Sequence, residues 1–125
     1  MPLPQRERDI QKAILHWLKL KRIFHFRANT GATSFGTGPK RRFVRFGEPG
    51  VPDIIAIRES AGIGQFVGVE VKGHDGALSL AQQNFSCRVL DAGGAYLVAR
   101  SLEDVVKFFE PPRGADVKRE GGKQP

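Results

Sequence analysis

Cysteine is almost absent from this chain of 125 residues, which contains Cys87 alone and therefore forms no internal disulfide. A single cysteine also gives no ligand spacing for a zinc site. A chain of this length buries roughly two-thirds of its unfolded surface, so it needs neither kind of cross-link to fold. No apolar run approaches the roughly 20 residues of a membrane span, and the polar start MPLPQRERD is unlike a secretory signal. We therefore expect a cytoplasmic protein with no membrane partner.

Acidic residues are few, and the charges are unevenly placed. The net charge of +7 divides into +9 over residues 1–46, −4 over residues 47–110 and +2 over residues 111–125. Lys and Arg attract the phosphate backbone of nucleic acids, whereas clustered acids hold divalent cations. This division is compatible with a nucleic-acid enzyme that has a metal site. The solvated faces of an ordinary basic protein would explain the charge alone equally well.

The hydrophobic periodicity predicts one α/β domain with elements in the order helix, strand, strand, strand, helix, strand, helix. The helices are expected at 5–21, 79–92 and 101–110, and the strands at 22–28, 53–57, 66–72 and 95–99. This domain spans residues 1–110. Residues 111–125 have almost no apolar content and are expected to form a disordered basic tail.

Two segments lack a regular pattern and are expected to connect elements. Residues 29–50 are rich in Gly, Thr, Arg and Lys. A connection this long in a compact domain is functional, mobile, or contains a short hairpin, which Phe43, Val44 and Phe46 would supply. Residues 58–65, RESAGIGQ, are expected to form the loop of a hairpin between the second and third strands.

Asp53 and Glu70 are predicted to face each other across that hairpin. If its turn is centred on Ala61 and Gly62, then Ile57 lies opposite Phe66 and Asp53 lies opposite Glu70. Directly opposed residues have Cβ atoms about 4.5–5.5 Å apart, and like charges at that distance are destabilising. A divalent cation between the two carboxylates would replace this repulsion with ligation.

Lys72 shares a strand face with Glu70, because side chains alternate across a strand. The other face of the strand carries Val67, Val69 and Val71 and should be core. Buried charges are seldom tolerated unless they are paired or bound to metal. A salt bridge from Lys72 to one of the acids is the alternative to a metal site.

Glu7 falls in line with Ile10 and Ile14, on the apolar stripe of the first helix. If that helix packs beside the hairpin, Glu7 would be a third carboxylate near the metal. The alternative is that an acid in the first turn complements the helix dipole.

The residues resemble a known family at this point. PGVPD at 49–53 and GVEVK at 68–72 resemble the PD-(D/E)xK nuclease superfamily, with the acids seventeen positions apart. ERDIQKAIL in the first helix, RANTGA at 27–32 and LSLAQ at 78–82 make the chain similar to the VRR-NUC branch, the virus-type replication-repair nuclease domain. The resemblance runs from about Glu7 to Val105. It implies a restriction-endonuclease-like αβββαβ core with a mixed central sheet flanked by helices.

The resemblance also implies roles for particular residues. Mg²⁺ or Mn²⁺ would be bound by Asp53, Glu70, the backbone carbonyl of Val71 and, as an outer or additional ligand, Glu7. Lys72 would orient or activate the attacking water and stabilise charge on the phosphate. Gln82 would line the site and support the water or Lys72.

Contacts to nucleic acid are expected from the basic residues of the first part of the chain. Arg27 and Asn29 match an R-x-N-x-G segment of the family, although Asn29-Thr-Gly could equally be a turn. Contacts to the phosphate backbone are expected from Lys40, Arg41, Arg42 and Arg45.

The function that the resemblance implies is structure-selective cleavage of branched DNA by a homodimer similar to Holliday junction resolvases. Three other interpretations stay open. One is a flap or single-strand nuclease of the same fold. Another is a nucleic-acid-binding module without catalysis, and the third is a structural domain with a buried ion-pair cluster.

Overall fold

The computed structural model describes residues 6–28, 32–45 and 47–111, and for residues 32–35 and 42–45 it describes the backbone alone. Four strands form a central sheet in the order β1-β4-β5-β6. The strands are β1 (His25–Arg27), β4 (Ile54–Ser60), β5 (Ile63–Val71) and β6 (Ala95–Ala99). The pairs β1–β4 and β4–β5 are antiparallel, and β5–β6 is parallel. The predicted mixed α/β architecture is therefore confirmed.

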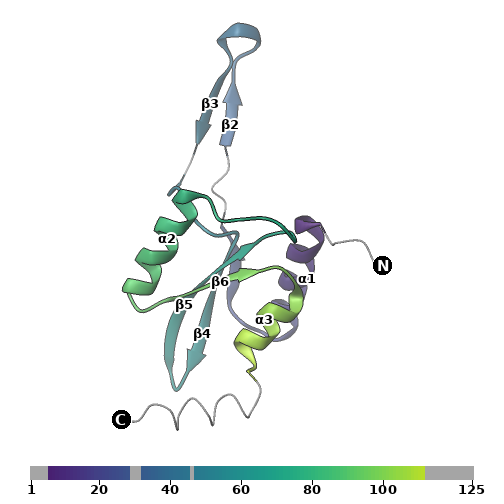
Figure 1. Ribbon diagram of the computed structural model, residues 1–125, viewed down its shortest axis with the longest axis vertical. Helices are drawn as coiled ribbons and strands as arrows, with labels where there is room; N and C mark the ends of the chain where they lie inside the picture. Colours follow the sequence, from purple (N-terminus) through teal and green to yellow (C-terminus); the bar gives the residue numbers. More distant parts are fainter. Residues whose placement is uncertain (1–5, 29–31, 46, 112–125) are drawn as a thin grey trace.

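Three helices cover the two faces of this sheet (Figure 1). They are α1 (Glu7–Leu20), α2 (Leu80–Asp91) and α3 (Leu102–Phe109). The first and last pack together on one face, and α2 lies on the other face (Figure 1). Within the part of the chain that the structure describes, no helix has the length and apolarity needed to cross a membrane.

The core lies between the sheet and the helices α1 and α3. Val67, Val69 and Val71 of β5 are fully or almost fully buried there, which confirms the face predicted for them. Alternation along β5 fixes this face because residues two apart point the same way. The buried partners from the helices are Ile10, Ile14, Leu18 and Val105.

The hairpin of β4 and β5 has the predicted register, with Ile57 paired to Phe66 and Ile54 paired to Val69. The expected eight-residue loop at 58–65 is wrong, because the strands continue to a two-residue turn at Ala61 and Gly62. Both turn residues have positive φ, 53° and 82°, as the tightest hairpin turns require. The side chain of Arg58 donates to Gln65 Oε1 at 2.7 and 3.1 Å, so polar cross-strand pairing supports a segment whose composition suggested a loop.

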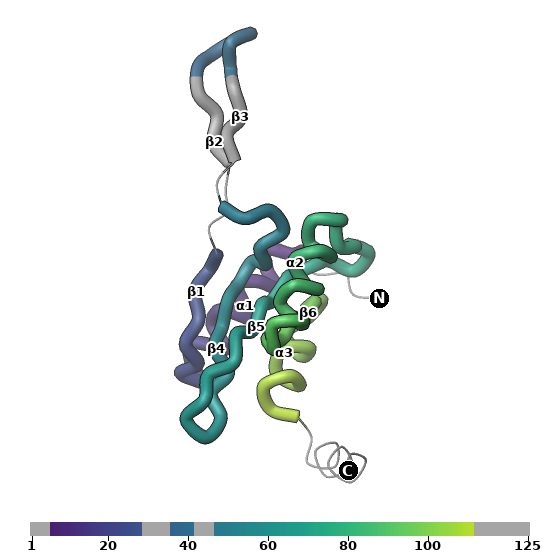
Figure 2. The backbone as a smooth tube through the Cα atoms, turned by 90° about the vertical axis from the view of Figure 1, so that its left-hand side faces the viewer, coloured from purple at the N-terminus to yellow at the C-terminus, as the bar shows by residue number. Residues whose placement is uncertain are grey.

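The first strand is shorter than the expected segment 22–28. Arg22 has a φ of 58°, which is a left-handed conformation that ends α1 and delays β1 until His25. The long connection at 29–50 does contain a hairpin, formed by β2 (Ala32–Phe35) and β3 (Arg42–Arg45) around the short helix η1 (Gly38–Lys40). This hairpin projects away from the body (Figure 1), and the turn between its strands is likewise the part farthest from the sheet in Figure 2. Phe46 and the expected disordered tail, apart from Pro111, lie outside the described residues.

Candidate active site

Asp53 directly precedes β4 and reaches across the hairpin to the end of β5. The Val71 N–H donates to Asp53 Oδ2 at 2.7 Å. Continued by two pairs, the hairpin register would place Val71 opposite Pro52, which has no N–H to donate to the Val71 carbonyl and so cannot extend the backbone ladder. The Val71 N–H is bound instead by the carboxylate of Asp53. Because the N–H and C=O of one residue face the same neighbouring strand, the Val71 carbonyl also faces the Asp53 side of β5.

Glu70 lies next to Val71 and is 4% exposed. Its Oε2 accepts a hydrogen bond from Gln82 Nε2 at 2.9 Å and lies 3.8 Å from Lys72 Nζ. Its Oε1 is buried and has no hydrogen-bond partner among the residues that the structure describes. A buried polar atom left unpaired costs about 1–3 kcal/mol, so this oxygen requires a cation, a donor, or a proton shared with Asp53, whose side chain forms a hydrogen bond with protonated Glu70.

Burial first, and then the negative charge of Asp53, raise the pKa of Glu70 from 4.5 to about 7. Lys72 acts in the opposite direction but does not cancel these two effects. One lysine therefore faces two carboxylates, and the cluster keeps a negative excess whenever both acids are ionised. A divalent cation at this position would compete with the Glu70 proton.

Gln82 joins the site because of how α2 begins. Ser79 caps the helix: its side chain accepts from the Gln82 N–H, and Gln82 Oε1 accepts from the Ser79 N–H at 2.8 Å. This reciprocal pair is a capping box, which fixes the amide of Gln82. The Nε2 group of the same amide donates to Glu70 Oε2. The Gln82 side chain therefore both stabilises the N-terminus of α2 and orients the buried acid.

Glu7 is exposed, so it does not continue the buried stripe formed by Ile10 and Ile14. It is the first residue of α1 and precedes the buried positions of the helix, which begin at Ile10. Its Oε2 accepts from the Gly73 N–H at 3.2 Å, and Arg100 donates to the Gly73 carbonyl at 2.7 Å. Glu7 thus holds the segment that follows Lys72. Among the described residues no three His, Cys, Asp or Glu side chains are grouped closely enough to hold a metal ion, so its role as a third ligand stays a prediction.

The residues expected to contact nucleic acid are only partly described. Arg27 is exposed at the end of β1, and the next residue, Ala28, donates its N–H to the Asp53 carbonyl at 3.0 Å. Lys40 and Arg41 are exposed at the tip of the β2–β3 hairpin. The side chains of Arg42 and Arg45, and all of Asn29, lie outside the described residues.

Tyr96 is a residue of this site that the sequence did not indicate. It pairs with Gly68 in the parallel register of β5 and β6, two positions before Glu70. Its hydroxyl oxygen is buried with no hydrogen-bond partner among the described residues. Burial, and then the charges of Glu70 and Asp53, raise the pKa of this hydroxyl above its ordinary range. The strand 95–99 was predictable, but its parallel pairing with β5, which brings Tyr96 to the acids, was not.

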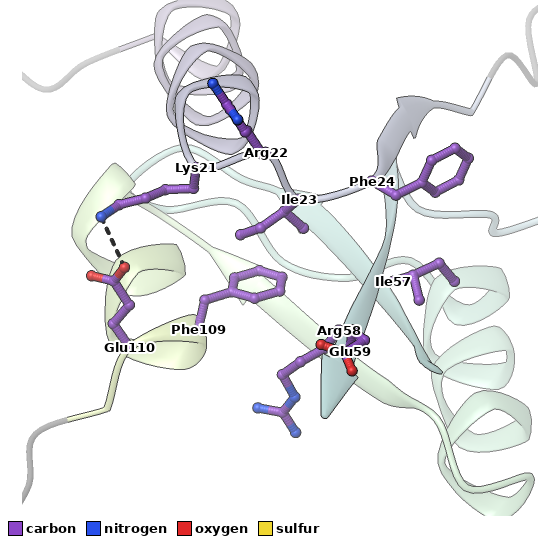
Figure 3. A pocket seen from close by; sticks show the side chains of 9 residues that line it. All are labelled: Lys21, Arg22, Ile23, Phe24, Ile57, Arg58, Glu59, Phe109 and Glu110. Carbon is purple, nitrogen blue, oxygen red and sulfur yellow. Dashed lines mark ion pairs between the residues drawn. The ribbon is translucent and has the colours of Figure 1, made fainter. Parts of the chain in front are cut away.

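A cavity of about 470 Å³ lies at the opposite end of β4 from Asp53, between residues 21–24, which follow α1, the strand β4 and the end of α3 (Figure 3). Its charged groups include an ion pair of 3.0 Å between Lys21 and Glu110 (Figure 3). Phe24 and Ile57 point away from Phe109 across this space (Figure 3). Asp53, Glu70 and Lys72 do not line this cavity, and they lie at the other end of β4.

Comparisons of the chain with protein-family models, with curated proteins and with solved structures found no match.

Proposed function

We propose that this protein is a metal-dependent nuclease that hydrolyses phosphodiester bonds in branched or otherwise structured DNA. The observation that carries the proposal is the convergence of Asp53, Glu70 and Lys72 at one end of the sheet, with Glu70 buried and its Oε1 without a hydrogen-bond partner among the described residues. A restriction-endonuclease-like core, membership of the VRR-NUC branch and a homodimeric state belong to the same proposal and rest on the sequence resemblance.

The residues present suit a hard divalent cation. Two carboxylates and the Val71 carbonyl, which faces Asp53, offer the oxygen ligands that Mg²⁺ and Mn²⁺ prefer. The unpaired Oε1 of Glu70 would gain a partner, and the negative excess of the cluster would be neutralised. When bound, the ion would lower the pKa of a water and neutralise charge on the phosphate.

The protein side chains have distinct tasks around such a cation. Lys72 is 16% exposed, so its ammonium can donate to a phosphate oxygen or to the attacking water while Glu70 holds it at 3.8 Å. Gln82 fixes the orientation of Glu70 by donating to Oε2. Glu7 and Arg100 hold Gly73, and through it the position of Lys72.

A purely structural ion-pair cluster explains these contacts less well. Lysine and glutamate alone would neutralise each other, but Asp53 adds a second acid beside them, and among the described residues no second cation acts on Glu70. Buried salt bridges in proteins usually contain equal numbers of positive and negative charges, because an uncompensated buried charge is strongly destabilising. The second acid is explained when a divalent cation completes the cluster.

The β2–β3 hairpin supports a nucleic-acid substrate. It projects from the end of the body at which α2 begins, the end that also carries the acid cluster (Figure 1). Lys40 and Arg41 at its tip are exposed and can approach a phosphate backbone beside the site. A duplex or branch lying against this end of the body would thus meet both the acids and the hairpin.

The test is cleavage of labelled four-way junction, flap, single-stranded and duplex DNA in Mg²⁺ or Mn²⁺. We expect Asp53→Asn to reduce the rate at least about 100-fold, since a lost direct ligand should exceed the effect of a lost outer partner. Asp91→Asn, the same change at an exposed position at the end of α2, is the matched control and should keep wild-type activity.

Undiminished cleavage by Asp53→Asn would contradict the proposal. Absence of cleavage by the wild-type protein on every substrate, with DNA binding that EDTA does not change, would favour the binding module without catalysis. A preference for flaps or single strands over junctions would select the alternative nuclease of the same fold.

A further inference from the structure

Two buried polar atoms on one face of the sheet have no partner among the described residues, Glu70 Oε1 and the Tyr96 hydroxyl oxygen. The parallel register places Tyr96 beside Gly68 and Glu70 beside Val98. Paired residues of neighbouring strands point to the same face, as do residues two apart along one strand. Tyr96 and Glu70 therefore project from the same face on adjacent strands.

Gly68 explains how the ring of Tyr96 fits beside the acids. A Cβ atom at position 68 would lie 3.4 Å from Tyr96 Cδ2 and 2.8 Å from Pro52 Cγ. The rings of Tyr96 and Pro52 thus occupy the space that any side chain at this position would need. Pro52 immediately precedes Asp53, so Tyr96 and the segment that carries this acid both lie beside Gly68, two residues before Glu70.

The needs of the two unpaired atoms are complementary. A phenolic hydroxyl has one proton to donate, and each carboxylate oxygen has two lone pairs to accept hydrogen bonds. An Oε1 that accepts from a phenol can therefore still bind a cation with its second lone pair. The raised pKa of Tyr96 keeps the hydroxyl protonated, and so able to donate, at physiological pH.

We propose that Tyr96 is a positioning residue of the site, whose hydroxyl donates a hydrogen bond to Glu70 Oε1 through one bound water. Gln82 already donates to Oε2, so the two donors together fix the plane of the Glu70 carboxylate. A fixed carboxylate binds a cation at a smaller entropic cost and in one geometry. The inference rests on the proposed function, because it assigns Tyr96 a task at that same cation site.

The first experiment compares wild type with Tyr96→Phe, which removes one oxygen atom and keeps the ring. Calorimetric titration with Mn²⁺ should show an affinity at least about tenfold weaker, as expected for loss of an outer partner of a metal ligand. Cleavage kinetics should show kcat reduced by a similar factor, with the KM for DNA within twofold of wild type. Ser86→Ala is the control: its hydroxyl donates within α2, to the Gln83 carbonyl, at 2.8 Å, and neither quantity should change.

The results for Mn²⁺ affinity and for cleavage distinguish the role of Tyr96 from the proposed nuclease function. If wild type cleaves DNA and Tyr96→Phe matches it in both Mn²⁺ affinity and kcat, the inference is overturned and the proposed function stands. If wild type binds Mn²⁺ without cleaving any substrate, the proposed function fails, and the Mn²⁺ affinity of Tyr96→Phe still decides the role of Tyr96. If wild type neither binds Mn²⁺ nor cleaves, both fail.

The second experiment does not depend on the folding of Tyr96→Phe. Tyr96 is the one tyrosine of the chain, so the tyrosine doublet in the ultraviolet resonance Raman spectrum reports its hydroxyl alone. We expect the wild-type doublet to show a donated hydrogen bond, which is lost in Glu70→Met, a variant of similar side-chain length without the carboxylate acceptor. A doublet identical in the two proteins overturns the inference.

Discussion

Glu70 is buried and lies near two charged residues that shift its pKa in opposite directions. Its protonation therefore contributes to the stability of the fold in a way that can be measured. Burial and the charge of Asp53 favour the neutral acid, and Lys72 favours the carboxylate. The folded protein therefore holds the Glu70 proton more tightly than the unfolded chain does. The free energy that this proton contributes to folding is fully present below about pH 4.5 and is lost as the pH rises through about 7.

In EDTA, we expect wild type to gain about 2 kcal/mol of unfolding free energy between pH 8 and pH 5.5, relative to Glu70→Gln over the same range. Glutamine cannot titrate, so the difference between the two profiles isolates this one group. Urea unfolding at a series of pH values measures it. Parallel profiles for the two proteins would show that Glu70 titrates near its ordinary value.

At the scale of elements, the turn before β4 and the start of α2 depend on each other. A Cβ atom on Gly50 would collide with the Ala81 carbonyl oxygen, and Gly50 has a φ of 82° that side chains rarely adopt. The backbone of the segment 49–53 thus lies directly against the first turn of α2. This contact sets the distance between Asp53, which ends that segment, and Gln82, which begins that helix.

We expect Gly50→Ala to lower the unfolding free energy by about 3 kcal/mol or more, because backbone strain and overpacking act together. Gly62→Ala is a matched control with the same φ of 82° and no atom within 4 Å of the added Cβ. It should lose about 1–2 kcal/mol, the cost of the strained conformation alone. Chemical denaturation of both variants measures the two losses, and equal losses would show that the turn and α2 are not in close contact.

At the scale of the whole molecule, the acidic cluster and the basic residues of the β2–β3 hairpin lie in different places. The acid cluster lies at one end of the sheet, and the β2–β3 hairpin projects from that end with Lys40 and Arg41 exposed at its tip. Cations set apart from the acids attract a polyanion without neutralising the cluster. If the hairpin contacts the backbone of DNA, binding must depend on these two residues and on ionic strength.

We expect the double variant Lys40→Ala, Arg41→Ala to bind DNA more weakly and to reduce the slope of log K against log salt by up to about 2. The double variant Lys12→Ala, Lys19→Ala removes the same charge from exposed positions of α1 and should change the slope less. Fluorescence anisotropy at several salt concentrations measures both. Equal weakening in the two variants would indicate attraction by net charge alone.

The sequence by itself determined what depends on local periodicity and on one short turn. Alternation predicted that Val67, Val69 and Val71 are buried and that Glu70 and Lys72 share a face, and the turn at Ala61 and Gly62 predicted the hairpin register. These features involve residues close in the chain, so few alternatives compete with them.

Only the tertiary structure decided how distant segments meet. The parallel pairing of β6 with β5 brings Tyr96 beside the acids, and the docking of α2 turns the capping amide of Gln82 toward Glu70. The packing of α1 leaves Glu7 exposed, where it binds the backbone of Gly73. Parallel pairing and helix docking depend on which surfaces of remote elements bury together, and local patterns do not encode that choice.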